Sequence, residues 1–270
     1  MKFITSISAA AFVLSAPLTN SFTITTSQSK SFISSSQLNH AAMGGYTMDT
    51  GFIDTELRGA AMKLHTRKQS PKEGEVEDKP TPVEPYVTTH LDYLKFLVDS
   101  QHVYQAFEEI VNMEELSTEL LPFINTGLER VQPLAKDIEF MVSEYNIEKP
   151  EVGPFGESYA KHMRGIASKG KEAIPEFMCH YYNYYFAHTA GGRMIGKKMA
   201  SLLLEKKTLE FYQWEGDLNE VKATVKESIE KMAADWSREE KDMCIAATKD
   251  AFIGGGGINA YLSGGKKMGH

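Results

Sequence analysis

Apolar residues along most of the chain recur at intervals of three and four, the spacing of one face of an α-helix. From Gly51 onward almost every apolar run follows this pattern. The strict alternation of apolar and polar residues that marks a half-buried strand is scarce. The sequence therefore predicts a single all-α domain of seven to nine helices, residues 49–265, followed by a short tail, residues 266–270.

Hydroxyl and carboxylate side chains stand where several of these helices should begin. Thr88 or Thr89 suits the cap of a helix over residues 90–111, and Asp217 suits the cap of a helix that starts at residue 218. Ser237 and Glu240 have the spacing of a capping box. These signals indicate three helix starts in addition to the apolar pattern.

Proline and glycine mark the expected interruptions. The proline-rich and acidic segment at residues 70–87 predicts a loop, and Pro175 suits the first turn of a long helix. Pro133 predicts a kink within a helix over residues 127–145. The four glycines at 254–257 predict the end of a helix.

Residues 1–48 differ from the rest of the chain. They contain no acid, only two lysines and sixteen serines or threonines. Lys2 and the apolar run after it have the order of a secretory signal peptide, and the hydroxyl-rich stretch that follows is typical of a plastid transit peptide opened by Phe22. We interpret the segment as a two-part presequence that directs the protein to the plastid stroma. The alternative is a secreted protein with a spacer.

Composition narrows the class of partner. Residues 49–270 carry 27 basic and 36 acidic residues, a net charge near −9, which argues against nucleic acid. No apolar run after residue 48 approaches the ~20 residues of a membrane helix. Cys179 and Cys244 form no metal or disulfide pattern, and we expect two reduced, half-buried thiols.

Three glycines lie inside the long helix that is predicted around residues 181–198. Glycine in a helix costs about 1 kcal/mol relative to alanine, so three need a reason. At steps of four, Tyr184, His188, Gly192 and Gly196 share one face, and Gly191 flanks it. Either another element packs closely against the bare backbone, or a flat ligand lies there. The periodicity leaves both explanations open.

One histidine falls on an apolar helical stripe. His65 follows Leu57 and Ala61 at steps of four, and Arg58 is two turns earlier on nearly the same face. Such a histidine is more often a hydrogen-bonded core residue than a ligand. As a ligand, a single imidazole with a nearby cation suits a flat anionic cofactor better than zinc, which takes three or four ligands. His90, His102 and His162 fall on polar or boundary positions and are expected at the surface.

Two further patterns bear on ligand and metal binding. Lys222 and Lys226 lie on one helical face, most simply as solvated charges, and alternatively as partners of two ligand carboxylates. A di-iron bundle would need paired Glu-x-x-His motifs, and the spacing from Glu176 to His180 does not supply one. Phosphate loops and serine-hydrolase motifs do not occur.

Several long segments resemble the plant and algal plastid heme oxygenases. The two most specific are "FMCHYYNYYFAHTAGGRMIGKK" and "AAMKLHTRKQ", and the likeness runs in order from about residue 52 to 253. Four shorter segments also match: "YLKFLVDSQHVY", "NTGLER", "LEFYQWEGDL" and "WSREEKDMC".

The resemblance implies an all-α fold that holds heme b between a proximal and a distal helix. It implies that His65 ligates the iron and that Gly191, Gly192 and Gly196 form the distal wall. It assigns the heme propionates to Arg58, Lys222 and Lys226, and places Tyr182 and His188 near distal water.

Two positions distinguish this chain within the family. Animal and many bacterial relatives carry aspartate where His188 stands, whereas the plastid type has histidine. Some plant relatives have lost the proximal histidine, and this chain keeps His65, which favours a working enzyme.

The implied reaction converts heme and O2 into biliverdin IXα, carbon monoxide and ferrous iron. Ferredoxin is the expected electron donor, with Arg193, Lys197 and Lys198 as a candidate basic docking site, and we expect a monomer without a membrane anchor. Two alternatives are a heme-binding or regulatory relative without turnover, and a protein of the same fold with another small ligand.

Overall fold

The computed structural model describes residues 51–65 and 86–264. The predicted presequence, the tail at 266–270 and most of the predicted loop at 70–87 lie outside these ranges. All described residues belong to one unit that begins at Met48. They form ten α-helices and no strand: α1 (Arg58–Lys63), α2 (His90–Val111), α3 (Ser117–Leu120), α4 (Val131–Tyr145), α5 (Pro154–Ala167), α6 (Ile174–Ala187), α7 (Arg193–Leu203), α8 (Leu218–Ala234), α9 (Arg238–Ala246) and α10 (Thr248–Asn259).

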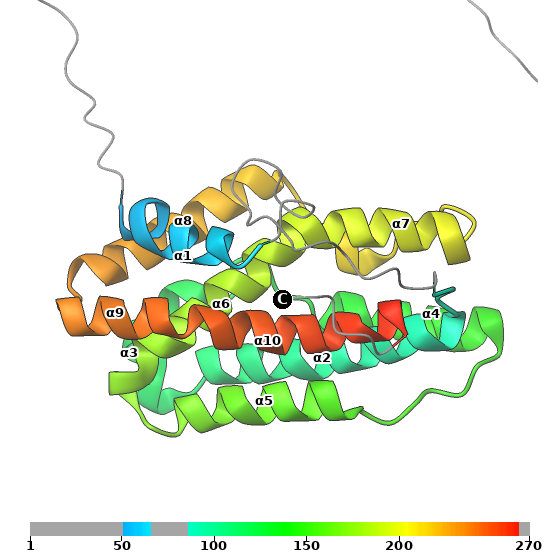
Figure 1. Ribbon diagram of the computed structural model, residues 1–270, viewed down its shortest axis with the longest axis horizontal. Coiled ribbons are helices and arrows are strands. Elements are labelled where there is room, and N and C mark those ends of the chain that lie inside the picture. Colours follow the sequence, from blue (N-terminus) through cyan, green and yellow to red (C-terminus); the bar gives the residue numbers. More distant parts are fainter. Residues whose placement is uncertain (1–50, 66–85, 265–270) are drawn as a thin grey trace, which may run out of the picture. The chain divides into compact units, whose positions relative to one another are not determined.

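Two π-helical turns extend these helices. The turn η1 (Ile53–Leu57) leads directly into α1, and η5 (His188–Gly192) joins α6 to α7. Helix therefore continues from residue 174 to 203, as Figure 1 shows. Counted this way, the described part contains nine helical rods, and the predicted all-α class is confirmed.

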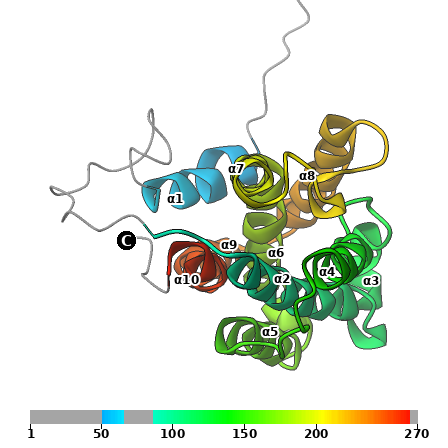
Figure 2. The same ribbon diagram turned by 90° about the vertical axis from the view of Figure 1, so that its right-hand side faces the viewer.

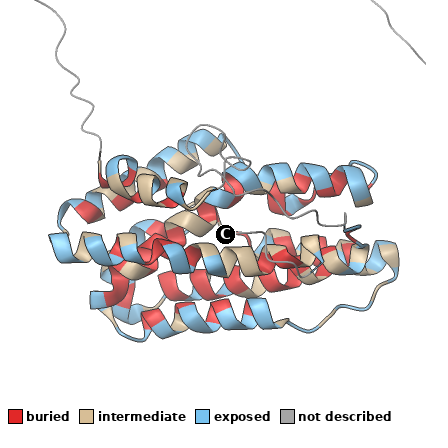
Figure 3. Cartoon of the chain, viewed as in Figure 1, coloured by how far each residue is buried: buried red, intermediate tan, exposed pale blue. Residues whose placement is uncertain are grey.

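The helices lie on two sides of α6. In Figures 1 and 2, α1, α7 and α8 lie above, while α2, α5 and α10 lie below. In both views α1 lies beside the long α6–η5–α7 helix. Figure 3 shows buried residues on the facing sides of the helices. The largest fully buried side chains come mostly from α2 and α6, among them Tyr93, Tyr104, Phe107, Phe177 and Tyr181.

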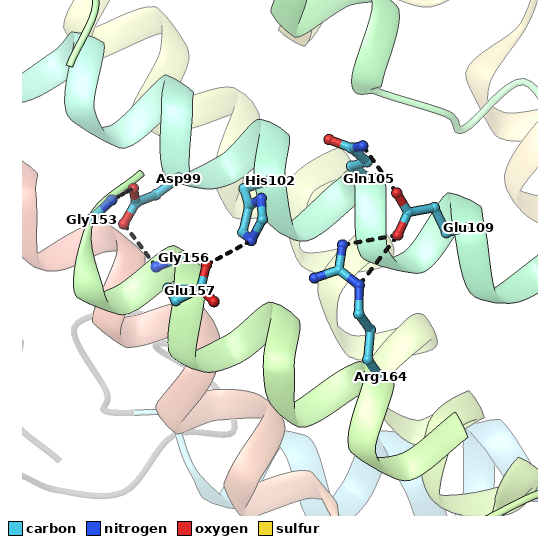
Figure 4. A network of polar contacts seen from close by, with 8 residues as sticks. All are labelled: Asp99, His102, Gln105, Glu109, Gly153, Gly156, Glu157 and Arg164. Carbon is cyan, nitrogen blue, oxygen red and sulfur yellow. Dashed lines mark hydrogen bonds and ion pairs between the residues drawn. The ribbon is translucent and has the colours of Figure 1, made fainter. Parts of the chain in front are cut away.

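Polar contacts fix α2 against α5, as Figure 4 shows. The buried Asp99 carboxylate accepts the backbone N–H groups of Gly153 and Gly156, at 2.7 and 2.8 Å. These are free donors at the start of α5, so the acid also satisfies the end of that helix. Further along, Arg164 forms an ion pair with Glu109 at 2.9 Å.

The predicted helix starts are confirmed. Thr89 caps α2 and forms a capping box with Asp92, Asp217 caps α8, and Ser237 and Glu240 form a capping box at α9. Pro175 lies in the first turn of α6.

Both predicted interruptions at Pro133 and at the glycine run are wrong. Helix α4 begins only at Val131, so Pro133 occupies its first turn, where a missing N–H costs nothing. Helix α10 passes through residues 254–257 and ends at Asn259. A Cβ at Gly254 would lie 2.5 Å from the Tyr159 ring. At that position glycine allows α10 to approach α5, rather than ending the helix.

Two surface expectations also need correction. His162 is exposed, but His90 and His102 are half-buried, and the His90 ring donates to the Leu203 carbonyl through Nε2 at 2.8 Å. The cysteines are fully buried rather than half-buried, with 0% of Cys179 and 1% of Cys244 exposed. Cys179 Sγ lies 3.5 Å from Thr248 Oγ1 of α10, a contact between residues that are far apart in the sequence.

Candidate functional site

His65 lies just after the end of α1. The predicted stripe is present, with Leu57 and Ala61 buried and His65 half-buried, but the helix ends at Lys63. In the last turn, the Leu64 N–H donates to the Ala61 carbonyl at 3.2 Å. The His65 ring contacts that carbonyl too, with Nδ1 3.0 Å from it.

This contact selects one tautomer of the imidazole. A carbonyl oxygen only accepts, so Nδ1 carries a proton, and in the neutral ring this leaves the lone pair on Nε2. Phe252 of α10 supports the ring edge-on, with 4.9 Å between ring centroids. A neutral histidine held through Nδ1 with Nε2 unprotonated is the form that ligates a metal.

The glycines of the long helix have three different surroundings. A Cβ at Gly191 would meet nothing within 4 Å, whereas one at Gly192 would lie 2.8 Å from His188 Nδ1. One at Gly196 would lie 2.6 Å from the Tyr212 ring. Close packing therefore explains Gly196, and open space beside the backbone remains at Gly191.

His188 is a buried residue of the π turn. Its Nε2 donates to the Phe211 carbonyl at 2.8 Å, and its ring stacks on the Phe211 ring at 3.9 Å between centroids. Burial lowers the pKa of His188 to about 3, so the imidazole is neutral near pH 7. The hydrogen bond leaves Nδ1 unprotonated and directed at Gly192.

Three predicted ligand-binding residues gather where η1 and α1 meet α6 and α8. Lys226 Nζ lies 2.5 Å from Asp54 Oδ2. Burial raises the pKa of the Tyr182 phenol to about 12; the charge of Asp54 adds to this, and that of Arg58 opposes it. The structure thus brings Arg58, Tyr182 and Lys226 together around Asp54. Lys222 is half-buried on α8, one turn before Lys226.

The sequence did not single out the acids of this cluster. Glu230 Oε1 accepts the backbone N–H of Ile53 at 2.9 Å, so α8 holds the start of the π turn η1. Asp54 comes from η1 and Glu230 from a helix far along the chain. Glu230 lies one helical turn after Lys226, whereas no local pattern connects Asp54 to either residue.

Two cavities lie away from these residues. One of about 630 Å³ is lined by residues of α3, α8 and α9 and by Trp236, which lies between α8 and α9. One of about 320 Å³ lies beside Asp137 and Lys207. Neither is lined by a residue predicted to contact heme. Residues 51–65 and 86–264 contain no group of three histidine, cysteine or acidic side chains placed to share a metal ion. Within the same ranges, no helix has the length and hydropathy required to span a bilayer.

Comparison with known sequences identifies a family. The heme oxygenase family model matches residues 55–254. Chloroplastic heme oxygenase 1 of Arabidopsis thaliana is 43% identical over 205 residues, which cover 75% of this chain and 70% of that protein. The rice protein of the same name is 43% identical over 207 residues, covering 77% and 70%. A probable inactive heme oxygenase 2 from Arabidopsis is 38% identical over 160 residues, covering 59% and 52%.

Solved structures have the same fold. Heme oxygenase from Leptospira interrogans aligns with a TM-score of 0.54 at 20% identity, covering 77% of this chain and 94% of that one. Heme oxygenase-1 from the cyanobacterium Synechocystis, solved in complex with heme, aligns with a TM-score of 0.52 at 22% identity, covering 65% and 78%. With the family model matched over most of the helical domain, this chain belongs to the heme oxygenase family.

Proposed function

We propose that this chain is a working heme oxygenase, which cleaves heme b to biliverdin IXα, carbon monoxide and ferrous iron with O2 and electrons from reduced ferredoxin. Heme is both substrate and cofactor, and its iron supplies the chemistry that activates O2. Family membership and the plastid heme oxygenases at 41–43% identity support the activity. The observation that carries the proposal is the orientation of His65, whose Nδ1 donates to the Ala61 carbonyl and so leaves Nε2 as the nitrogen available to a metal.

His65 would hold heme from the proximal side. The Ala61 carbonyl fixes the tautomer, and Phe252 restricts rotation of the ring. An imidazole restrained in this way presents Nε2 to the iron.

The distal wall would be the π turn. Gly191 exposes bare backbone, and a Cβ added there would have no neighbouring atom within 4 Å, so a flat ring can approach it closely. His188 is neutral and donates its only N–H to Phe211, which supports a role in holding Gly192 and ordering the turn. The π turn would then place no strong acid over the heme ring.

The propionates would bind the cluster on η1, α1 and α8. Arg58, Lys222 and Lys226 provide three positive charges there, and Tyr182 adds a phenol that stays protonated because its pKa is about 12. Asp54 holds Lys226 in position before ligand arrives. A propionate would exchange this partly exposed ion pair for another, at little cost.

Electrons would enter at the start of α7. Arg193, Lys197 and Lys198 are all exposed, beside the distal turn, and an acidic donor such as ferredoxin would favour them. The chloroplastic relatives support a plastid location. We extend this to the stroma, reached through the two-part presequence at 1–48, and to a monomer.

Spectroscopy of the purified protein tests the function. Addition of hemin should give a Soret band that saturates at one heme per chain. With ferredoxin, its reductase and NADPH, this band should decay as biliverdin absorbance grows. A saturable Soret band that persists under reduction and O2 would instead identify a heme-binding relative without turnover, and lack of binding would contradict both.

A further inference from the structure

A short segment packs against the distal turn (His188–Gly192), and the family assignment gives this segment no role. It is the 3-10 turn η6 (Glu210–Tyr212), within the motif "LEFYQWEGDL". The turn follows α7 and contacts the distal helix at two points. The Phe211 carbonyl accepts from His188 Nε2, and the Tyr212 ring covers Gly196.

One buried carboxylate holds this turn. Asp137 of α4 is 3% exposed and accepts the backbone N–H of Glu210 at 2.9 Å and that of Phe211 at 2.7 Å. Each carboxylate oxygen takes one amide. The acid is far from the distal helix in sequence, yet it fixes the residue whose carbonyl meets His188.

A buried guanidinium holds the other end. Arg130 is 4% exposed, and its Nη1 donates to the Gln213 carbonyl at 2.6 Å. The guanidinium lies 4.8 Å from the centre of the Trp214 ring. Since Arg130 precedes α4 and Asp137 lies within it, one helix anchors both sides of η6.

The contacts on the distal helix lie on either side of Gly192. His188 is four residues before it and Gly196 four residues after it. The two residues of η6 that make these contacts are themselves held by α4 and α2. The Phe211 N–H donates to Asp137 of α4, and the Tyr212 hydroxyl lies 3.3 Å from the Tyr93 hydroxyl of α2. The bare backbone at Gly191 is thus left on the side that η6 does not cover.

We propose that Asp137 is a positioning residue for the distal turn. Through the two amides of η6 it aims the Phe211 carbonyl at His188, which selects the Nε2–H tautomer and sets where the Gly191–Gly192 backbone stands. The inference rests on the proposed function for its consequence in turnover. The contacts that run from Asp137 through η6 to His188, here called the clamp, are present in the protein without heme.

Long-range proton–nitrogen NMR of the heme-free protein tests the clamp directly. His188 should show a protonated Nε2 and a bare Nδ1. In Asp137→Asn, the amide group can accept only one of the two N–H groups and opposes the other. The exchange of the Phe211 amide and of the His188 ring proton should then be at least about tenfold faster. Glu139→Gln removes an exposed charge from the same helix and should leave both rates unchanged.

Turnover provides the second readout. Asp137→Asn should lower kcat roughly fivefold and change KM for heme less than about twofold, since the propionate cluster is untouched. A Nδ1–H tautomer in the wild type overturns the clamp even if the variant does not fold. Unchanged exchange and kcat in a folded Asp137→Asn overturn it as well. A wild type that binds but never degrades heme contradicts the proposed function, while the NMR result still decides the clamp.

Discussion

Lys226 Nζ and Asp54 Oδ2 lie 2.5 Å apart, and the pair joins α8 to the π turn that precedes α1. Lys226 is 34% exposed and Asp54 is 44% exposed, so the pair is weak and open to exchange. Under the proposed function, Lys226 would bind a heme propionate, and Asp54 neutralises the Lys226 charge until heme arrives.

Substitution of Lys226 should therefore weaken heme binding more than it weakens folding. Lys226→Gln removes one propionate partner worth on the order of 1 kcal/mol, or roughly a fivefold rise in Kd. Heme titration by Soret absorbance measures this. Lys231→Gln, which breaks an exposed pair with Glu227 on the same helix, serves as the control and should bind as the wild type does. Equal Kd values for the two variants would remove Lys226 from the site.

Gly191 and Gly196 should respond in opposite ways to alanine. Gly191→Ala adds a Cβ to open space, so the heme-free protein should gain up to about 1 kcal/mol of stability while heme binding or turnover falls. Gly196→Ala places a Cβ 2.6 Å from the Tyr212 ring and should cost about 1–3 kcal/mol. Thermal melts and heme titrations of both variants give the comparison. If Gly191→Ala binds and turns over heme normally, the backbone there is not the distal wall.

The glycine run of α10 offers a second pair of positions for comparison. A Cβ at Gly256 would meet nothing within 4 Å, so Gly256→Ala should stabilise the helix by about 1 kcal/mol. Gly254→Ala would place its Cβ 2.5 Å from the Tyr159 ring and should destabilise the protein. Urea unfolding measures both free energies. A destabilised Gly256→Ala would show that α10 needs the flexibility of that residue.

Acid should destabilise the protein through His180. This residue is 0% exposed, the Tyr159 hydroxyl meets its Nδ1 at 3.0 Å, and burial lowers its pKa to about 3. Because the unfolded imidazole takes up a proton below about pH 6.5 and the folded one does not, stability falls from that pH toward 3. The loss approaches roughly 1.4 kcal/mol per pH unit.

Comparison of the wild type with His180→Phe isolates this effect. Between pH 6.5 and 5, urea unfolding should show a loss about 2 kcal/mol larger in the wild type than in the variant. Asp137 contributes with the opposite sign: burial raises its pKa to about 6, so its protonation adds stability as pH falls below that value. Identical pH dependence of the two proteins would mean that His180 does not resist protonation.

Local patterns in the sequence were enough for the helix starts and the all-α class. Thr89, Asp217 and Ser237 act on N–H groups two or three residues away, so their effect is visible in a short window. Periodicity also placed Leu57, Ala61 and His65 on one stripe. Periodicity could not show that the helix ends at Lys63. That end depends on the His65 ring, which competes for the Ala61 carbonyl.

The features that could not be predicted from the sequence depend on contacts between residues far apart in the chain. Glycine runs usually end helices, and only the Tyr159 ring on α5 gives Gly254 another role. Asp54 and Asp137 look like ordinary acids until tertiary structure brings Lys226 to one and the amides of η6 to the other. Burial of His188 likewise depends on Phe211, 23 residues later.

The most direct test of the central claim is heme turnover by His65→Ala, measured with and without added imidazole. Exposed His162→Ala serves as the control. If His65 Nε2 holds the iron, His65→Ala should lose biliverdin formation and the histidine-ligated spectrum, imidazole should restore part of both, and His162→Ala should match the wild type. Normal turnover by His65→Ala would contradict the account.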